Sequence, residues 1–251
     1  MRKESLEQRL QEIAQSLAQY EHALALLGLG SAGVETERMD EFSDLDFFVI
    51  VQAGCKAEFL NDLSWLDSIC PIAYHFANSA DGYKLLFADG IFCEMAIFEL
   101  EELHSAIYSA GRILWKRPQV PAEIAIPAVK NSPILHDPEW LIGEAVTNLY
   151  VGMARDLRGE KLSAMRFIQY YAVDRLVELT ELIEPAQGCF KDEFSAERRF
   201  EMHHPLTCAQ LPDFMQGYKH NPESALAILD FLELHFSVNP AMSQAIRSYC
   251  R

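Results

Sequence analysis

Residues 44–51, with the sequence DLDFFVIV, constrain the fold most, because they combine the strongest strand signal in the chain with two acids at its start. Their aromatic and β-branched side chains are typical of a buried strand. Strand side chains alternate between faces, so Asp44 and Asp46 project from the same face, about 7 Å apart. Two carboxylates at this spacing repel each other unless a cation lies between them. The segment therefore predicts a strand with a cation site at its beginning.

The first part of the chain alternates between strand and helix patterns. Apolar residues at three- and four-residue spacing predict a helix over 4–19, and the apolar run 23–29 predicts a buried strand that ends at Gly30-Ser31. Asp89-Gly90 suits the tight turn of a hairpin. The remaining expected elements are strands at 71–76, 83–87 and 91–98 and helices at 56–66 and 99–108.

The pattern changes after about residue 112. Five prolines within 117–138 predict an extended linker, and Asp137-Pro138 is a favourable helix start. Long helices are then expected to Leu157, over 161–183 and over 222–236. We therefore predict an α+β protein. Its N-terminal domain (1–112) has a mixed sheet flanked by helices, and a Pro-rich linker (113–137) leads to an all-α helical bundle (138–251).

Two further features accompany the acids of residues 44–51. Glu94 lies within the apolar strand segment IFCEMAIF, where an ionised acid is costly without a partner, and a neighbouring strand position would make it a third carboxylate of the same site. Gly30-Ser31 offers backbone N–H groups and a hydroxyl to an anion. Mg²⁺ is the expected cation, because it binds carboxylates together with substrate phosphates.

The charge of the chain excludes several partners. Its 251 residues hold 21 Lys+Arg and 37 Asp+Glu, a net charge of −16, which argues against nucleic acid and against docking on anionic lipid. The first 110 residues alone hold 6 of these cations and 19 of these acids. The N-terminus lacks the apolar region of a secretory signal, and the six cysteines are scattered, so we expect a cytoplasmic protein with reduced thiols.

The stretch GSAGVETERMDEFSDLDFFVIV resembles the signature of DNA polymerase β-type nucleotidyltransferases, in which Gly-Ser precedes Asp-x-Asp on a strand and a later strand supplies a third acid. The segments EFSDLDF and CEMAIFE, followed by a helical domain, are most similar to the antibiotic (lincosamide and aminoglycoside) nucleotidyltransferases. A weaker similarity covers residues 141–165. One departure is the acidic segment between Ser31 and Asp44, in which Arg38 is the only cation.

The resemblance implies an adenylyltransferase-like enzyme. Gly30 and Ser31 would hold the triphosphate of ATP or GTP. Asp44 and Asp46 would bind Mg²⁺, with two ions expected, and Glu94 would be the third ligand or the general base. On the helical domain, Asn148 and Arg155 would contact the nucleotide. The acceptor would be a small hydroxylated molecule such as an antibiotic, and the acidity of the first domain favours a cationic one.

Two other functions stay open at this stage. The same chemistry could modify a protein or an RNA, as in toxin–antitoxin systems, although the acidity weakens the RNA version. The chain could also be a nucleotide-binding module without activity, although it keeps Ser31 and all three acids. The sequence leaves open the nucleobase, the acceptor and whether two copies form a homodimer.

Overall fold

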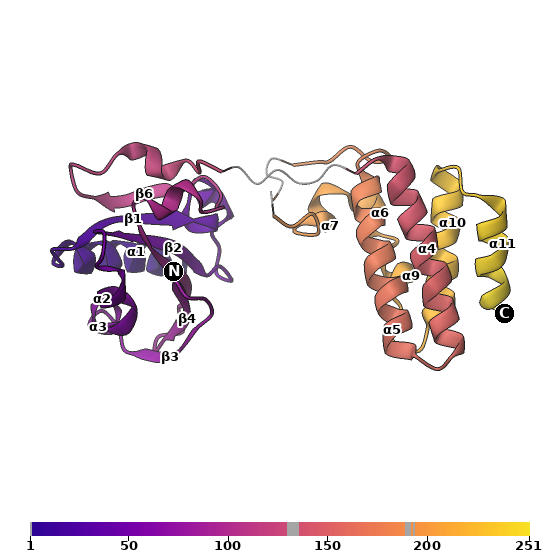
Figure 1. Ribbon diagram of the computed structural model, residues 1–251, viewed down its shortest axis with the longest axis horizontal. Helices are drawn as coiled ribbons and strands as arrows, with labels where there is room; N and C mark the ends of the chain where they lie inside the picture. Colours follow the sequence, from indigo (N-terminus) through magenta and orange to yellow (C-terminus); the bar gives the residue numbers. More distant parts are fainter. Residues whose placement is uncertain (1, 130–135, 189–191, 193) are drawn as a thin grey trace. The chain divides into compact units, whose positions relative to one another are not determined.

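The computed structural model describes residues 2–129, 136–188, 192 and 194–251. Its contacts divide the chain into two compact units, Met1–Asn131 and Ser132–Arg251 (Figure 1). The first unit combines a sheet with helices, whereas the described elements of the second unit are all helical.

One six-stranded mixed sheet forms the centre of the first unit, with the strand order β3-β4-β5-β2-β1-β6 (Figure 1). Neighbouring strands are antiparallel except β2 and β5, which are parallel, so the beginnings of these two strands lie side by side. The first five strands confirm the sequence prediction, and β6 was not predicted. The strands are β1 (Ala23–Leu29), β2 (Leu45–Val51), β3 (Ile72–Ala77), β4 (Gly82–Phe87), β5 (Phe92–Glu99) and β6 (Arg112–Lys116).

Alternate side chains of β2 enter two different cores. Leu45, Phe47 and Val49 pack on the face that α1 (Arg2–Ala18) and the short helices α2 (Lys56–Asn61) and α3 (Ser64–Asp67) help to bury. Phe48 and Ile50 pack on the other face, with apolar residues of the segment 100–126. That segment contains the 3₁₀ helices η3 (Glu102–His104) and η4 (Ala122–Ala125).

Two helix predictions in the first unit were wrong in detail. Residues 99–108 form only the single turn η3, because the Glu102 carboxylate accepts a hydrogen bond from the Glu99 backbone N–H at 2.7 Å, which favours a turn over a continuing helix. The helix expected over 56–66 is broken at Asp62, whose Oδ1 accepts a hydrogen bond from the Ser64 N–H at 2.9 Å.

The linker prediction was wrong for residues 113–129. They begin within the edge strand β6, and Val120 and Ile124 are buried in the second core. The prolines here lie in the turns after an edge strand, where no ladder hydrogen bond is lost. Pro133, also assigned to the linker, lies outside the described residues.

In the second unit, α4 begins where its capping residue predicts it, because the Asp137 side chain accepts a hydrogen bond from the Glu139 N–H at 2.7 Å. The helix expected over 222–236 is α10, which begins at Asn221 without a side-chain cap. That this unit is an independent domain stays a prediction. No helix in the described part of the chain is both long and apolar enough to span a membrane. The helices are α4 (Pro138–Leu157), α5 (Lys161–Arg166), the π-helical η5 (Phe167–Ala172), α6 (Val173–Thr180), α7 (Phe200–His203), α8 (Pro205–Cys208), α9 (Leu211–Phe214), α10 (Asn221–His235) and α11 (Pro240–Tyr249).

Candidate active site

Three charged side chains form a row across β4, β5 and β2 on one face of the sheet. The register pairs Asp46 with Glu94 in the parallel β2/β5 ladder, and Glu94 with Lys84 in the antiparallel β4/β5 ladder. Side chains at paired positions project from the same face, with Cβ atoms about 5 Å apart. The Lys84 ammonium binds the Glu94 carboxylate with an Nζ–Oε2 distance of 2.9 Å. The structure therefore brings Asp46 and Glu94 together, and their catalytic role stays a prediction.

Asp44 adds a second carboxylate to the start of β2. It is half-buried and lies directly before β2, two residues before Asp46. The pKa of Lys84 is raised, most of all by its hydrogen bond to Glu94 and the charge of that group, and further by Coulombic attraction from Asp46 and Asp44. Three carboxylates and one ammonium thus form one cluster with a net negative charge.

Glu94 is held by two groups that the sequence interpretation missed. The Asn78 side-chain amide donates a hydrogen bond from Nδ2 to Glu94 Oε1 at 3.0 Å, and Lys84 binds the other oxygen. A signal for Lys84 was present in the sequence, because a hairpin centred on Asp89 places residue 84 opposite residue 94. Asn78 lies in the loop between β3 and β4, and no pattern in the sequence indicates its contact.

The turn after β1 packs directly against Asp46. Gly30 has a φ of +52°, and a Cβ at this position would lie 2.8 Å from Asp46 Oδ2. An L-residue would be strained at this φ, and its Cβ would displace the Asp46 carboxylate. Both effects favour glycine at position 30. The backbone folds back over the strand end, since a Cβ on Gly28 would lie 2.4 Å from the Ala32 carbonyl oxygen. Ser31, within the 3₁₀ helix η1 (Gly30–Ala32), is half-buried.

Side chains from distant segments hold this turn in place. Arg112 of β6 donates a hydrogen bond from Nε to the Ala32 carbonyl at 3.1 Å and binds Glu7 of α1 at 2.9 Å. The turn closes on itself through a 3.1 Å bond from the Gly33 N–H to the Gly30 carbonyl. Arg38 forms an ion pair with Glu35, and its Nη2 would lie 3.9 Å from a Cβ on Gly30. A guanidinium therefore lies beside the turn, despite the acidity of the segment.

The arrangement suits an anionic ligand bound through a metal ion. Asp44, Asp46 and Glu94 are half-buried, and the Glu94 side chain is 41% exposed, so solvent and ligands can reach the carboxylates. Behind them on the same face, the rings of Phe48 and Phe98 pack edge to face with centroids 4.7 Å apart. An apolar layer thus lies beside the acids on this face of the sheet.

Asn148 and Arg155 belong to α4 of the second unit. The Arg155 guanidinium donates a hydrogen bond to Ser163 Oγ at 2.5 Å and lies 4.3 Å from the ring centroid of Phe167. It thereby ties α4 to the following helices, which is a structural role for this side chain. Asn148 is half-buried. Contact of either residue with a nucleotide stays a prediction.

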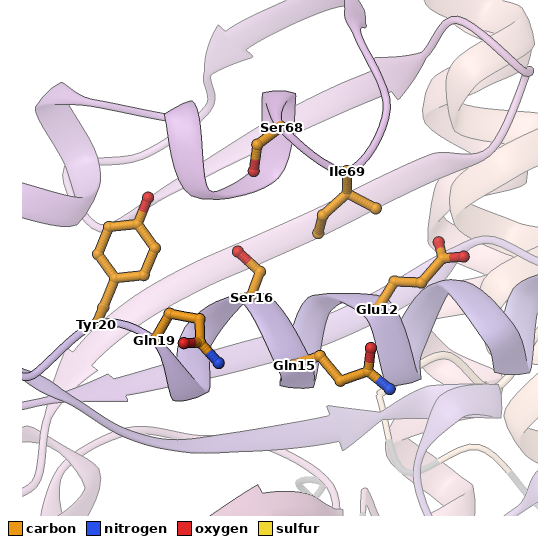
Figure 2. A pocket seen from close by; sticks show the side chains of 7 residues that line it. All are labelled: Glu12, Gln15, Ser16, Gln19, Tyr20, Ser68 and Ile69. Carbon is orange, nitrogen blue, oxygen red and sulfur yellow. The ribbon is translucent and has the colours of Figure 1, made fainter.

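A surface groove on the first unit holds none of the predicted site residues. Figure 2 shows its lining, which comes from α1 and from the turns after α1 and α3 and consists mostly of polar residue types. The Ser16 hydroxyl in this groove already donates a hydrogen bond to the Trp65 carbonyl at 2.6 Å. The groove offers no cluster of carboxylates, so we assign the chemistry to the sheet face.

No protein-family model matches the chain, and no curated protein does. The solved structures that are similar to it include two crystal structures. An aminoglycoside 6-adenyltransferase from Bacillus subtilis has 16% identity, covers 97% of each chain and has a TM-score of 0.35. A nucleotidyltransferase-like protein from Exiguobacterium sibiricum has 12% identity, covers 97% of this chain and 77% of its own, and also has a TM-score of 0.35.

Both similarities are weak in sequence and in fold. What the chain does is therefore inferred from the carboxylates and the Gly30 turn.

Proposed function

We propose that the chain is a nucleotidyltransferase that transfers a nucleoside monophosphate from ATP or GTP to a hydroxyl group of a small acceptor. The observation that supports this most is the contact between the Gly30 turn and Asp46, where a Cβ would lie only 2.8 Å from the carboxylate. A phosphate held by this turn would lie next to the acid that is paired in register with Glu94. Phosphate and carboxylates so close together require a cation between them.

The donor set fits Mg²⁺. Asp44, Asp46 and Glu94 supply only oxygen atoms, which this ion prefers, and their partial exposure leaves positions for phosphate oxygens and water. When bound, two such ions supply charge neutralisation for the attacking, leaving and non-bridging oxygens.

The side chains of the chain bind and orient the substrates. The Gly30 turn and the Ser31 hydroxyl bind the phosphates beyond the α-position, and Arg112 holds the turn through Ala32. The acceptor oxygen forms a bond to the α-phosphorus while the bond to the bridging oxygen breaks, and pyrophosphate leaves with that electron pair. The acceptor's proton passes to Glu94, which Asn78 and Lys84 keep in place. If Glu94 is instead a third metal ligand, a water molecule takes this proton.

The charge of the first unit favours a cationic acceptor. Residues 1–131 hold 20 acids and 10 cations, and only three of these acids belong to the proposed site. The others give the region a negative field, which attracts a positively charged guest such as an aminoglycoside or a lincosamide. We therefore propose an antibiotic-like amine with a free hydroxyl as the acceptor class.

The proposed function is tested by release of pyrophosphate. The full chain is incubated with ATP or GTP, Mg²⁺ and a panel of aminoglycosides and lincosamides, with a neutral polyol as control, at low and high salt. We expect turnover with a cationic member, its loss on chelation of Mg²⁺, and weaker acceptor binding at high salt. Turnover only when a protein or RNA is added would favour the alternative acceptors. Nucleotide binding without turnover on any acceptor would contradict the enzyme proposal.

Lys84 provides a separate prediction, because its ammonium occupies the face where the metal is expected. Replacing Lys84 with methionine removes a cation that interacts with all three carboxylates, so Mn²⁺, used as a probe for Mg²⁺, should bind roughly tenfold more tightly. The measurement is a titration of nucleotide-free protein by electron paramagnetic resonance. Lys116→Met is the control, since its ammonium instead binds the Val120 carbonyl. Equal Mn²⁺ affinity in wild type and Lys84→Met would show that Lys84 does not compete with the metal.

A further inference from the structure

A second cluster of metal-binding side chains lies at the other end of β1 and β2. His22 precedes β1, and Cys55 and Glu58 belong to the turn after β2 and to the first turn of α2. The antiparallel register pairs Ala23 with Val51, which brings these two turns together. One ligand atom from each of the three side chains lies within 4.8 Å of the others.

The spacing of these atoms is close to that of a tetrahedral site. His22 Nδ1 and Glu58 Oε2 are 2.8 Å apart. One ring nitrogen of His22, the sulfur of Cys55 and one carboxylate oxygen of Glu58 all lie within 4.8 Å of one another. Ligand atoms around a tetrahedral Zn²⁺, with bonds of 2.0–2.3 Å, are about 3.3–3.8 Å apart. Small rotations of half-exposed side chains therefore suffice to reach binding distances.

The backbone that carries the three ligands is already ordered by hydrogen bonds. The Gln52 N–H donates to the His22 carbonyl at 2.9 Å, and the Cys55 N–H donates to the Gln52 carbonyl at 3.0 Å. The Gly54 N–H donates to the Glu99 carboxylate at 2.8 Å. A metal ion would therefore bind side chains on two turns that are already ordered. The free-energy cost of ordering these turns on metal binding is small.

We propose that His22, Cys55 and Glu58 bind one Zn²⁺ ion, with water as the fourth ligand. An imidazole, a thiolate and a carboxylate are the ligand types that Zn²⁺ takes, and the two anionic ligands balance its charge. The nearby carboxylates of Glu21 and Glu99 act electrostatically on His22 and Cys55 and add to the attraction of a cation. The sulfur distinguishes this site from the oxygen-only site at Asp44, Asp46 and Glu94.

The zinc site is separate from the phosphate site. β1 has seven residues, so its two ends are about 20 Å apart, and His22 adjoins one end while Gly30 adjoins the other. The ion would tie the turn before β1 to the turn after β2 without contact with the phosphate site. Its loss should therefore lower the thermal stability of the protein and leave nucleotidyl transfer unchanged.

The test uses Co²⁺ as a coloured probe for Zn²⁺ in full-length protein that has been treated with chelator and a phosphine reductant. We expect one equivalent to give a thiolate-to-cobalt charge-transfer absorption with the intense visible bands of a tetrahedral ion, and Zn²⁺ to displace it. Cys55→Ser should abolish the charge-transfer band, and His22→Gln should weaken Co²⁺ binding at least tenfold. Cys70→Ser, which changes another half-buried thiol, should have no effect.

Two outcomes would overturn the zinc site: absence of the charge-transfer band in wild type, or its persistence in Cys55→Ser. Asp46→Asn serves as a second control, because it removes a proposed Mg²⁺ ligand and should leave the Co²⁺–thiolate band intact. A chain without nucleotidyl transfer activity could still bind Zn²⁺ here, so failure of one proposal does not imply failure of the other.

Discussion

Replacing Asp46 with asparagine is expected to lower the rate of nucleotidyl transfer by about 10³-fold while the protein stays folded. The substitution keeps the shape of the side chain and removes the negative charge that faces Glu94 across the β2/β5 ladder and lies against the Gly30 turn. The rate is measured as pyrophosphate release at saturating Mg²⁺, and folding is checked by circular dichroism. Mn²⁺ binding to the nucleotide-free protein should weaken in parallel.

Glu37→Gln is the matched control for this substitution. Glu37 is an exposed acid in the 3₁₀ helix η2 (Thr36–Arg38), within the acidic segment that leads to β2, and it belongs to no proposed site. Glu37→Gln removes one negative charge from the same unit, as Asp46→Asn does. Because Glu37 belongs to no proposed site, we expect near wild-type activity. If Asp46→Asn and Glu37→Gln had equal activities, Asp46 would hold no essential metal ion and the proposed site would be wrong.

Replacing Gly30 with alanine is expected to lower both stability and activity. The φ of +52° costs an L-residue about 1–2 kcal/mol, and the new Cβ would lie 2.8 Å from Asp46 Oδ2. The carboxylate must then move, and a misplacement of this kind costs about 10²-fold in rate. Denaturant unfolding measures the stability, and pyrophosphate release measures the activity.

Gly90→Ala separates these two effects. Gly90 has a φ of +87°, in the hairpin turn between β4 and β5, and a Cβ there would meet no atom within 4 Å. Similar backbone strain without the collision should give a comparable loss of stability with activity retained. Equal activities of the Gly30→Ala and Gly90→Ala proteins would show that the approach of Gly30 to Asp46 has no catalytic importance.

The elements that the sequence predicted well are those whose signal is local. The buried strand from Leu45 to Val51 is specified by its own aromatic and β-branched residues, and α4 begins at a proline after an aspartate cap. The segment 113–129 was wrongly predicted to be a linker. Prolines indicate the conformation of the local backbone but not which residues pack against it. Val120 and Ile124 are buried because the sheet leaves an apolar face open, which depends on strands far away in the chain.

For the candidate site too, some residues could be identified from the sequence and others only from the structure. Gly30, Ser31, Asp44, Asp46 and Glu94 could be chosen from their residue types and order alone. The symmetry of the hairpin could have predicted that Lys84 lies opposite Glu94. An isolated lysine in a strand, however, gives no reason to look for its partner. Arg112 gave no signal, because its contact with Ala32 joins residues 80 positions apart.

The sequence alone therefore determined five of the six strands, which residues carry the acids, and that a glycine turn precedes them. Only the tertiary structure decided that β2 and β5 are parallel neighbours in a register that pairs Asp46 with Glu94, and that the Gly30 turn lies against Asp46. Strand formation follows from the conformational preferences of each residue and from alternating hydrophobicity, which are local. Register and neighbour choice follow from burying two faces of one sheet at once, so they depend on every strand together.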